Sequence, residues 1–391
     1  MINNSFLGRY MEYRKFHASS CVIVMLDTGY LTVADCIRGF EKLGHRVYAI
    51  APGEEFIKRL LTLFVEVKPD FLMAVNHLGF DEEGKLTELL TELKLPFAVW
   101  YVDSPTYVLK DDTRNVSDYC ALFCWDSWYL DKIEGMGYLS SVQLSLATDP
   151  DIFLPLNKGA RCCPDIPLSF VANSMKFNTE EWRKKVSKAT YEKLKTIAVT
   201  RQLESRQLPM SEILSDLVGP DDNDGIDLEA SFIWEATKEY RLRLIEALIP
   251  LGMTVYGDKG WHEFLSDSSC VRPPVDYYRQ LPQVFNSTRV NFNATSFQMK
   301  HAVNQRVFDV AACGAFLLTD RMPDMENYFE IGKEAVCYET VEEAVDLSRY
   351  YLARTTQREK VAEGARKRVL ADHTYSKRMS VIIDHMRERF G

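Results

Sequence analysis

Residues 304–320 contain the side chains of this chain that are best suited to binding chemistry. A polar start, Asn304-Gln305-Arg306, precedes a predicted apolar helix, which a glycine ends before a short apolar strand. Free N–H groups at the start of a helix, beside the Arg306 guanidinium, suit an anionic phosphate. Asp309 lies one turn further on, where its carboxylate can accept hydrogen bonds from a ribose diol. An ordinary strand–loop–helix unit with a solvated arginine and aspartate is the alternative interpretation.

The composition limits the class of protein. The chain has 391 residues, of which 46% are hydrophobic and 26% are charged, so we expect a globular protein of two domains. A net charge of −9 argues against a nucleic-acid partner. No apolar run reaches the roughly 18 residues that span a bilayer, and the polar first 20 residues do not resemble a signal peptide. The nine scattered cysteines predict reduced thiols and a cytoplasmic location.

Strand and helix patterns alternate along the first half of the chain. This alternation predicts a parallel sheet covered by helices on both faces, in which ligands bind beyond the carboxyl ends of the strands. We expect strands at 21–27, 46–51, 71–76, 97–102 and 121–125, and helices at 31–43, 56–67 and 86–93. The polar residues that follow these strands are Asp27, Asn76-His77, Asp103-Ser104 and Asp126-Ser127.

The proline-marked stretch at 147–167 predicts a linker, after which the alternation resumes. We expect strands at 168–172, 254–256, 270–272, 290–293 and 315–319, and helices at 241–251, 278–286, 307–313, 341–352, 357–370 and 376–389. A charged and mostly helical insert is expected at 179–240. The predicted domains are therefore 1–160 and 165–374, with a closing helix at 375–391 that packs back onto the first domain.

The order and spacing of several motifs resemble the CgeB-like, spore-maturation type of glycosyltransferase, which has the GT-B fold. The resemblance covers nearly the whole chain except the insert. It rests on residues 68–81, 100–105, 124–127 and 146–155 in the first half, and on 169–173, 256–261, 306–320 and 373–378 in the second.

The resemblance implies two Rossmann-like parallel-sheet domains that face a cleft, with a nucleotide-sugar donor on the C-terminal domain and an acceptor on the N-terminal domain. It places Asp309 at the ribose and Arg306 at the diphosphate. The partner acid of many relatives would fall near His301, so the two-glutamate signature is not kept. The donor-binding residues that we predict are Tyr256, Gly257, Lys259, Tyr277, Asn304, Arg306 and Asp309.

For two of these residues there is also a physical reason to expect a contact with the donor. Gly257 lets the backbone approach the donor closely, and Tyr277 lies in a segment that frames the base by stacking or by backbone hydrogen bonds. For the acceptor proton, Asp103 and His77 are the candidate bases, since both follow strands of the N-terminal sheet. The alternative roles are a turn or capping aspartate before Ser-Pro, and a hydrogen-bonded loop histidine.

A metal site and a cofactor are not expected. Asp222-Asn223-Asp224 matches an acid-x-acid metal motif, but it lies between Pro220 and Gly225 in a charged insert, which favours a turn. The glycine patterns of dinucleotide-binding and phosphate-binding loops do not occur.

We therefore predict a glycosyltransferase of the hexosyltransferase kind that uses a UDP-linked sugar and acts on a protein, glycan or small-molecule acceptor. Two alternatives stay open. One is a binding scaffold for a nucleotide sugar or glycan that has lost its catalytic ability, and the other is a nucleotide-sugar epimerase with the same fold.

Overall fold

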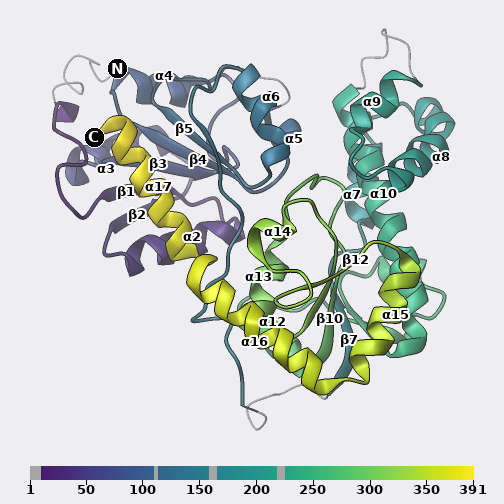
Figure 1. The fold of residues 1–391 in the computed structure, drawn as a ribbon. Helices are drawn as coiled ribbons and strands as arrows, with labels where there is room; N and C mark the ends of the chain where they lie inside the picture. Colours follow the sequence, from purple (N-terminus) through teal and green to yellow (C-terminus); the bar gives the residue numbers. More distant parts are fainter. Residues whose placement is uncertain (1–9, 110–112, 158–164, 218–224) are drawn as a thin grey trace. The chain divides into compact units, whose positions relative to one another are not determined.

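The computed structural model describes residues 10–109, 113–157, 165–217 and 225–391, and the chain forms two compact units (Figure 1). Unit 1 comprises Met1–Ala147 and Thr374–Gly391, and unit 2 comprises Thr148–His373. The first boundary thus falls at the start of the proline-marked stretch rather than at residue 160. The reason is local packing: Phe153 contacts the rings of Tyr277 and Phe285, so residues 148–157 belong to unit 2.

Within the described residues, unit 1 is built on a six-stranded parallel sheet of order β2-β1-β3-β4-β5-β6. The strands are β1 (Val22–Leu26), β2 (Arg46–Ile50), β3 (Phe71–Val75), β4 (Phe97–Tyr101), β5 (Cys120–Cys124) and β6 (Ser141–Gln143). The helical elements are α2 (Leu31–Lys42), α3 (Phe56–Val67), α4 (Lys85–Glu92), α5 (Pro105–Leu109), η1 (Ser127–Tyr129), α6 (Leu130–Gly135) and α17 (Tyr375–Phe390). Every residue of β1, β3, β4 and β5 is buried, which explains their continuous apolar sequences.

The last helix of the chain, α17, packs on α2 of unit 1. Gly39 makes this close approach possible, because a β-carbon there would lie 2.8 Å from the side chain of Met379 and 3.2 Å from the backbone of Tyr375. Arg378 on α17 donates hydrogen bonds to the Ser145 and Leu146 carbonyl oxygens of the same unit. The chain therefore returns to unit 1 at its end.

Over its described residues, unit 2 forms a second six-stranded parallel sheet, of order β12-β11-β10-β7-β8-β9. Its strands are β7 (Ile166–Val171), β8 (Met253–Tyr256), β9 (Val271–Arg272), β10 (Thr288–Asn293), β11 (Leu317–Asp320) and β12 (Val336–Tyr338). Its helical elements outside the insert are η3 (Ile249–Leu251), α11 (Trp261–Phe264), η4 (Ser268–Cys270), α12 (Leu281–Ser287), α13 (Gln305–Ala312), α14 (Met325–Tyr328), α15 (Val341–Leu352) and α16 (Thr355–Asp372).

The predicted insert is helical. It contains α7 (Lys176–Arg183), α8 (Lys188–Glu204), α9 (Met210–Ser215) and α10 (Gly225–Leu248). Helix α10 is longer than expected and continues from the insert into the helix predicted at 241–251, so the insert shares a rigid element with the sheet-bearing part of unit 2. Asp222-Asn223-Asp224 lies outside the described residues.

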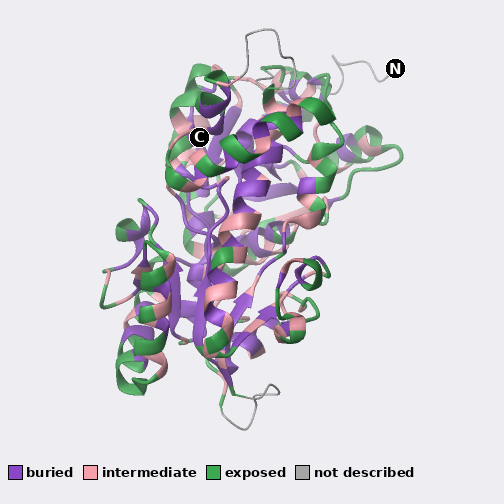
Figure 2. Cartoon of the chain, turned by 90° about the vertical axis from the view of Figure 1, so that its right-hand side faces the viewer, coloured by how far each residue is buried: buried purple, intermediate pink, exposed green. Residues whose placement is uncertain are grey.

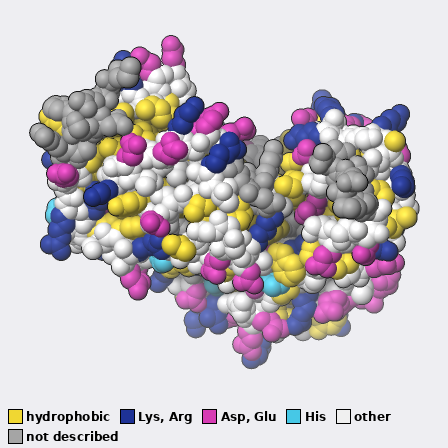
Figure 3. All heavy atoms as spheres, turned by 90° about the horizontal axis from the view of Figure 1, so that it is seen from above, with side chains coloured by type: hydrophobic (Ala, Val, Ile, Leu, Met, Phe, Trp, Pro, Cys, Tyr) yellow, Lys and Arg dark blue, Asp and Glu magenta, His cyan; other side chains and the backbone are white. Residues whose placement is uncertain are grey.

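The strands form the buried centre of each unit, and the outer faces of the helices are exposed (Figure 2). On the face drawn in Figure 3, acidic and basic side chains are interspersed, as on an ordinary solvated surface. Among the helices that the structure describes, none is both long and apolar enough to cross a membrane.

Candidate functional site

The order of the strands in unit 2 marks a switch point between β7 and β10. From β7 the chain adds strands outward through β8 and β9, and from β10 it adds them in the other direction through β11 and β12. Ligands of such sheets bind beyond the carboxyl ends of the strands at this point. Arg241 of α10 bridges the two loops there, since it donates to Asn173 O at 3.1 Å and to Ala294 O at 3.3 Å.

Helix α13 begins beside this switch point, after the loop 294–303 that follows β10. A chain of hydrogen bonds holds its first residue. Asn304 Nδ2 donates to Asn293 Oδ1 at 2.9 Å, and Asn293 Nδ2 donates to Thr319 Oγ1 at 2.9 Å. The start of α13 is thereby tied to the ends of β10 and β11, and its N–H groups have a defined position at the carboxyl edge of the sheet.

Arg306 lies in the first turn of α13 and is half-buried. Within the described residues its guanidinium makes no hydrogen bond or ion pair. Burial lowers the pKa of Arg306, whereas the nearby Tyr277 and Asp309 raise it. Burial also lowers the pKa of Arg241 to about 9, and the positive charge of Arg306 lowers it further. Two arginines that repel each other at a switch point favour an anionic ligand between or beside them.

Asp309 lies one turn after Arg306 and is fully buried. The Tyr277 hydroxyl donates a hydrogen bond to Asp309 Oδ2 at 2.5 Å. Phe153 contacts the Tyr277 ring edge-to-face, with the ring centroids 5.2 Å apart, which helps to fix the ring that carries this hydroxyl. The structure thus brings three of the predicted donor residues together: Arg306, Asp309 and Tyr277.

The loop after β8 carries the other predicted donor residues. Tyr256 ends β8 and is half-buried, and Lys259 is exposed. Gly257 has a packing reason that the sequence did not reveal, since a β-carbon there would lie 2.2 Å from Ala172 O and 2.6 Å from Trp261 Nε1. Asp258 ties this loop to the loop after β7 by accepting hydrogen bonds from the backbone N–H and the hydroxyl of Ser174. The donor roles of all the predicted residues stay predictions: Tyr256, Gly257, Lys259, Tyr277, Asn304, Arg306 and Asp309.

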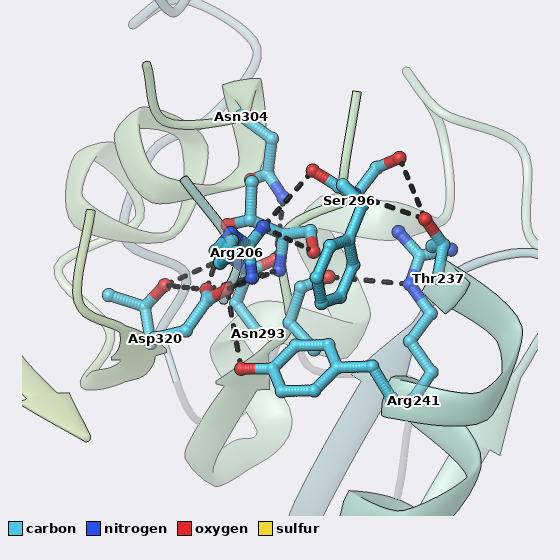
Figure 4. Close-up of polar contacts among 12 residues, drawn as sticks. Arg206, Thr237, Arg241, Asn293, Ser296, Asn304 and Asp320 are labelled. Carbon is cyan, nitrogen blue, oxygen red and sulfur yellow. Dashed lines mark hydrogen bonds and ion pairs between the residues drawn. The ribbon is translucent and has the colours of Figure 1, made fainter. Parts of the chain in front are cut away.

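The structure adds residues that the sequence did not single out. Asp320, at the end of β11, is 3% exposed and accepts hydrogen bonds from the backbone and hydroxyl of Thr295. Arg206 of the insert forms an ion pair with the same carboxylate (Figure 4). Nothing in the sequence marks Arg206, which lies among many charged residues of the insert, because its partner is more than 100 residues away.

In unit 1 the switch point lies between β1 and β3, and the candidate bases follow β3 and β4. Asp103 is half-buried. One of its oxygens, Oδ2, accepts hydrogen bonds from the Tyr30 hydroxyl and from Asn76 Nδ2, the latter at 2.9 Å. Its other oxygen makes no hydrogen bond to any described residue. Asp103 is therefore oriented by two donors and keeps one oxygen for a further partner.

Asn76 and His77 both have left-handed backbone conformations, each with φ 54°. Consecutive non-glycine residues in this region are strained, and here the Asn76 side chain compensates, since its Oδ1 accepts from the backbone of Val102 and Asp103. This backbone conformation points the Asn76 side chain toward Asp103. It also turns His77 into the interior, where its ring lies among those of Phe80, Tyr101 and Tyr138.

His77 is 7% exposed, and its Nδ1 is hydrogen-bonded to the Tyr101 hydroxyl. Burial lowers the pKa of His77 to about 3. A group with this pKa is a weak base at neutral pH. The geometry therefore favours Asp103 over His77 as the base, and the role of each stays a prediction.

The burial of His77 predicts a pH dependence of stability. The pKa of His77 is about 3 in the folded chain and near 6.5 when unfolded, so between these values the unfolded chain binds more protons and stability falls as the pH is lowered. By pH 5 the loss is about 2 kcal/mol, at about 1.36 kcal/mol per pH unit. Urea denaturation of the full chain at pH 7 and pH 5 measures this loss of stability. His77→Phe should lose about 2 kcal/mol less than the wild type, whereas the exposed control His262→Gln should behave as the wild type. Equal losses in all three would show that His77 is protonated without cost.

Residues 240–384 match a family model described as "Glycosyl transferase-like". This stretch includes the C-terminal part of α10, the loop 294–303 and α13 with Arg306 and Asp309. A search of curated proteins finds no match.

Three solved structures resemble nearly the whole chain. A glycosyltransferase from Rickettsia africae ESF-5 has a TM-score of 0.55 and 11% identity, and the likeness covers 95% of this chain and 99% of that one. Anabaena Alr3699/HepE, in complex with UDP and glucose, has a TM-score of 0.56 and 10% identity over 94% and 100%. Sucrose-phosphate synthase (tll1590) from Thermosynechococcus elongatus has a TM-score of 0.56 and 10% identity over 94% and 98%.

The fold is GT-B. Two parallel sheets with these strand orders, and likeness to these structures along nearly the whole chain, establish it. The fold class predicted from the sequence is confirmed. Structural likeness at 10 to 11% sequence identity shows the GT-B fold alone, and it does not show that this chain shares a substrate with those proteins.

Proposed function

We propose that the protein is a glycosyltransferase that moves a sugar from a UDP-linked donor to an acceptor hydroxyl. The observation that carries this proposal is Arg306. A half-buried guanidinium with no hydrogen-bond partner among the described residues stands in the first turn of α13, beside the switch point of the unit 2 sheet. Arginine remains charged even when burial lowers its pKa, and its fork of donors matches phosphate oxygens. The ligand that satisfies this site is an anion of the diphosphate kind.

The residues around Arg306 fit the rest of a nucleotide. In this proposal Asp309, whose Oδ2 accepts a hydrogen bond from the Tyr277 hydroxyl, is assigned to the ribose diol, and the Tyr277 ring is assigned to the base. Tyr256, Gly257 and Lys259 complete the proposed donor site at the end of β8. The Anabaena structure that resembles this chain holds UDP and glucose, which supports a uridine nucleotide here. The motif order favours the CgeB-like type within this class.

In the proposed reaction an acceptor oxygen attacks the anomeric carbon while the bond from that carbon to the diphosphate breaks. Arg306 and the N–H groups of α13 stabilise the negative charge of the departing diphosphate, so we expect no metal in the transfer. In an inverting mechanism, Asp103 of unit 1 takes the acceptor proton. In this proposal the acceptor, whether protein, glycan or small molecule, binds to unit 1. We also propose that the protein is cytoplasmic.

A thermal-shift screen against nucleoside diphosphates and nucleotide sugars tests the proposal first. A ligand at 100 times its dissociation constant stabilises the folded chain by about 2.7 kcal/mol, so UDP or a UDP-sugar should raise the melting temperature measurably. An unchanged melting temperature with every nucleotide would contradict the proposed donor site.

Incubation with the responding nucleotide sugar then separates the three candidate activities. Release of UDP, with the sugar moved to an acceptor or to water, is the result that a glycosyltransferase gives. Conversion of the sugar without release of UDP identifies an epimerase. Binding without either change identifies a scaffold that has lost catalysis.

A further inference from the structure

The insert, which is part of unit 2, contacts the loop that leads into α13. Loop 294–303 joins β10 to α13 and thereby carries Asn304 and Arg306 at its end. The turn at 205–209, between α8 and α9, lies against this loop, and so does the middle of α10 (Figure 4). Three groups of contacts connect the insert to the loop.

The first group is centred on Arg206. Its guanidinium donates to Asp320 Oδ2 at 3.1 Å, to Thr295 O at 2.8 Å and to Ser296 O at 3.0 Å. The same guanidinium lies over the ring of Phe297, 4.6 Å from its centroid. One side chain of the insert therefore binds three consecutive residues of the loop and the carboxylate that anchors the loop to β11.

The second group fixes the turn that presents Arg206. Gln202 is fully buried, and its Nε2 donates to the carbonyl oxygens of Ser205, Arg206 and Leu208. Lys300 of the loop donates from Nζ to the Arg206 and Leu208 carbonyl oxygens, at 3.0 and 3.1 Å. A buried lysine is costly unless its charge is satisfied, so this contact depends on the turn keeping its shape.

The third group comes from α10. The Phe297 N–H donates to Thr237 Oγ1 at 3.0 Å, and Arg241 donates to Ala294 O. In addition, Gln207 Nε2 donates to Lys300 O at 3.0 Å. The insert thus bonds the loop at its beginning and in its middle, while the Asn304–Asn293 hydrogen bond holds its end.

We propose that the insert is a positioning element for the nucleotide site and that Arg206 is its principal positioning residue. By binding loop 294–303, Arg206 sets where α13 begins and where Arg306 lies. This inference rests on the proposed function for its ligand, but the ordering of the loop does not. The alternative is that the insert only packs beside the sheet, with no effect on the loop or on nucleotide binding.

The test uses the full chain with Arg206→Met, Arg206→Lys and a matched control. Arg201→Met is that control, because Arg201 is a partly exposed arginine of the same insert that pairs with the exposed Asp216. Two quantities are measured: hydrogen exchange of the amides at 295–308, and the dissociation constant of UDP by calorimetry. For Arg206→Met we expect at least tenfold faster exchange at 295–308 and at least a tenfold larger dissociation constant, with exchange in unit 1 unchanged. Arg206→Lys should recover part of both, and Arg201→Met should match the wild type.

Unchanged exchange at 295–308 in Arg206→Met would overturn the proposal, and so would unchanged UDP affinity in a variant whose loop has loosened. If the wild type binds no nucleotide, the proposed function fails and the exchange data alone decide the inference. Should Arg206→Met not fold, the exposed Gln207→Ala decides it instead. That variant removes one hydrogen bond and should accelerate exchange around Lys300 alone, whereas unchanged exchange would overturn the proposal.

Discussion

Replacing Asp103 with asparagine is expected to slow sugar transfer by about 100- to 10,000-fold, the usual contribution of a positioned general base. Asparagine keeps the shape of the side chain and an oxygen for the Tyr30 and Asn76 donors, so unit 1 should fold as before. It cannot take a proton from the acceptor. Because Asp103 belongs to unit 1 and Arg306 to unit 2, the affinity for UDP should not change.

Steady-state transfer rates and UDP calorimetry on the same preparations provide the measurement. Asp27→Asn is the matched control, since Asp27 follows strand β1 of the same sheet and, among the described residues, accepts only a local hydrogen bond from the backbone of Gly29. We expect that control to transfer sugar at nearly the wild-type rate. Full activity in Asp103→Asn would assign the removal of the acceptor proton to another group.

The predictability of the fold follows from how the strands are buried. The central strands β1, β3, β4 and β5 are buried on both faces, and their uninterrupted apolar sequences identified them. The short strands β6 and β12, at the edges of the two sheets, were not predicted. Each has three residues and partly exposed positions, too few to give a pattern in the sequence.

In the candidate site, too, the sequence indicates residues that are close together along the chain but not the contacts between distant segments. Arg306 and Asp309 could be singled out as candidates because they lie within one helix start, where residues three positions apart lie on the same face of the helix. The hydrogen bond from Tyr277 to Asp309 joins residues of two different segments, and no local pattern encodes it. Arg206 and Asp320 are further apart still, and the insert that carries Arg206 was interpreted as an addition to the fold rather than as part of the site.

Replacing Arg306 with alanine is expected to weaken UDP binding by about 1.5–3 kcal/mol, the range for hydrogen bonds to a charged group. This corresponds to roughly a 10- to 150-fold larger dissociation constant. Alanine is a good helix former, and Arg306 makes no hydrogen bond with the described residues, so α13 should persist. The loss should therefore appear in ligand affinity rather than in the melting temperature of the free protein.

Calorimetry with UDP measures this effect, and comparison with uridine assigns it. Uridine lacks the diphosphate, so its affinity should be nearly the same for the wild type and for Arg306→Ala. The control is Arg321→Ala, because Arg321 follows β11 in the same unit but is more exposed and pairs with Glu326. Its UDP affinity should equal that of the wild type. Equal UDP affinity in Arg306→Ala and the wild type would remove Arg306 from the diphosphate site.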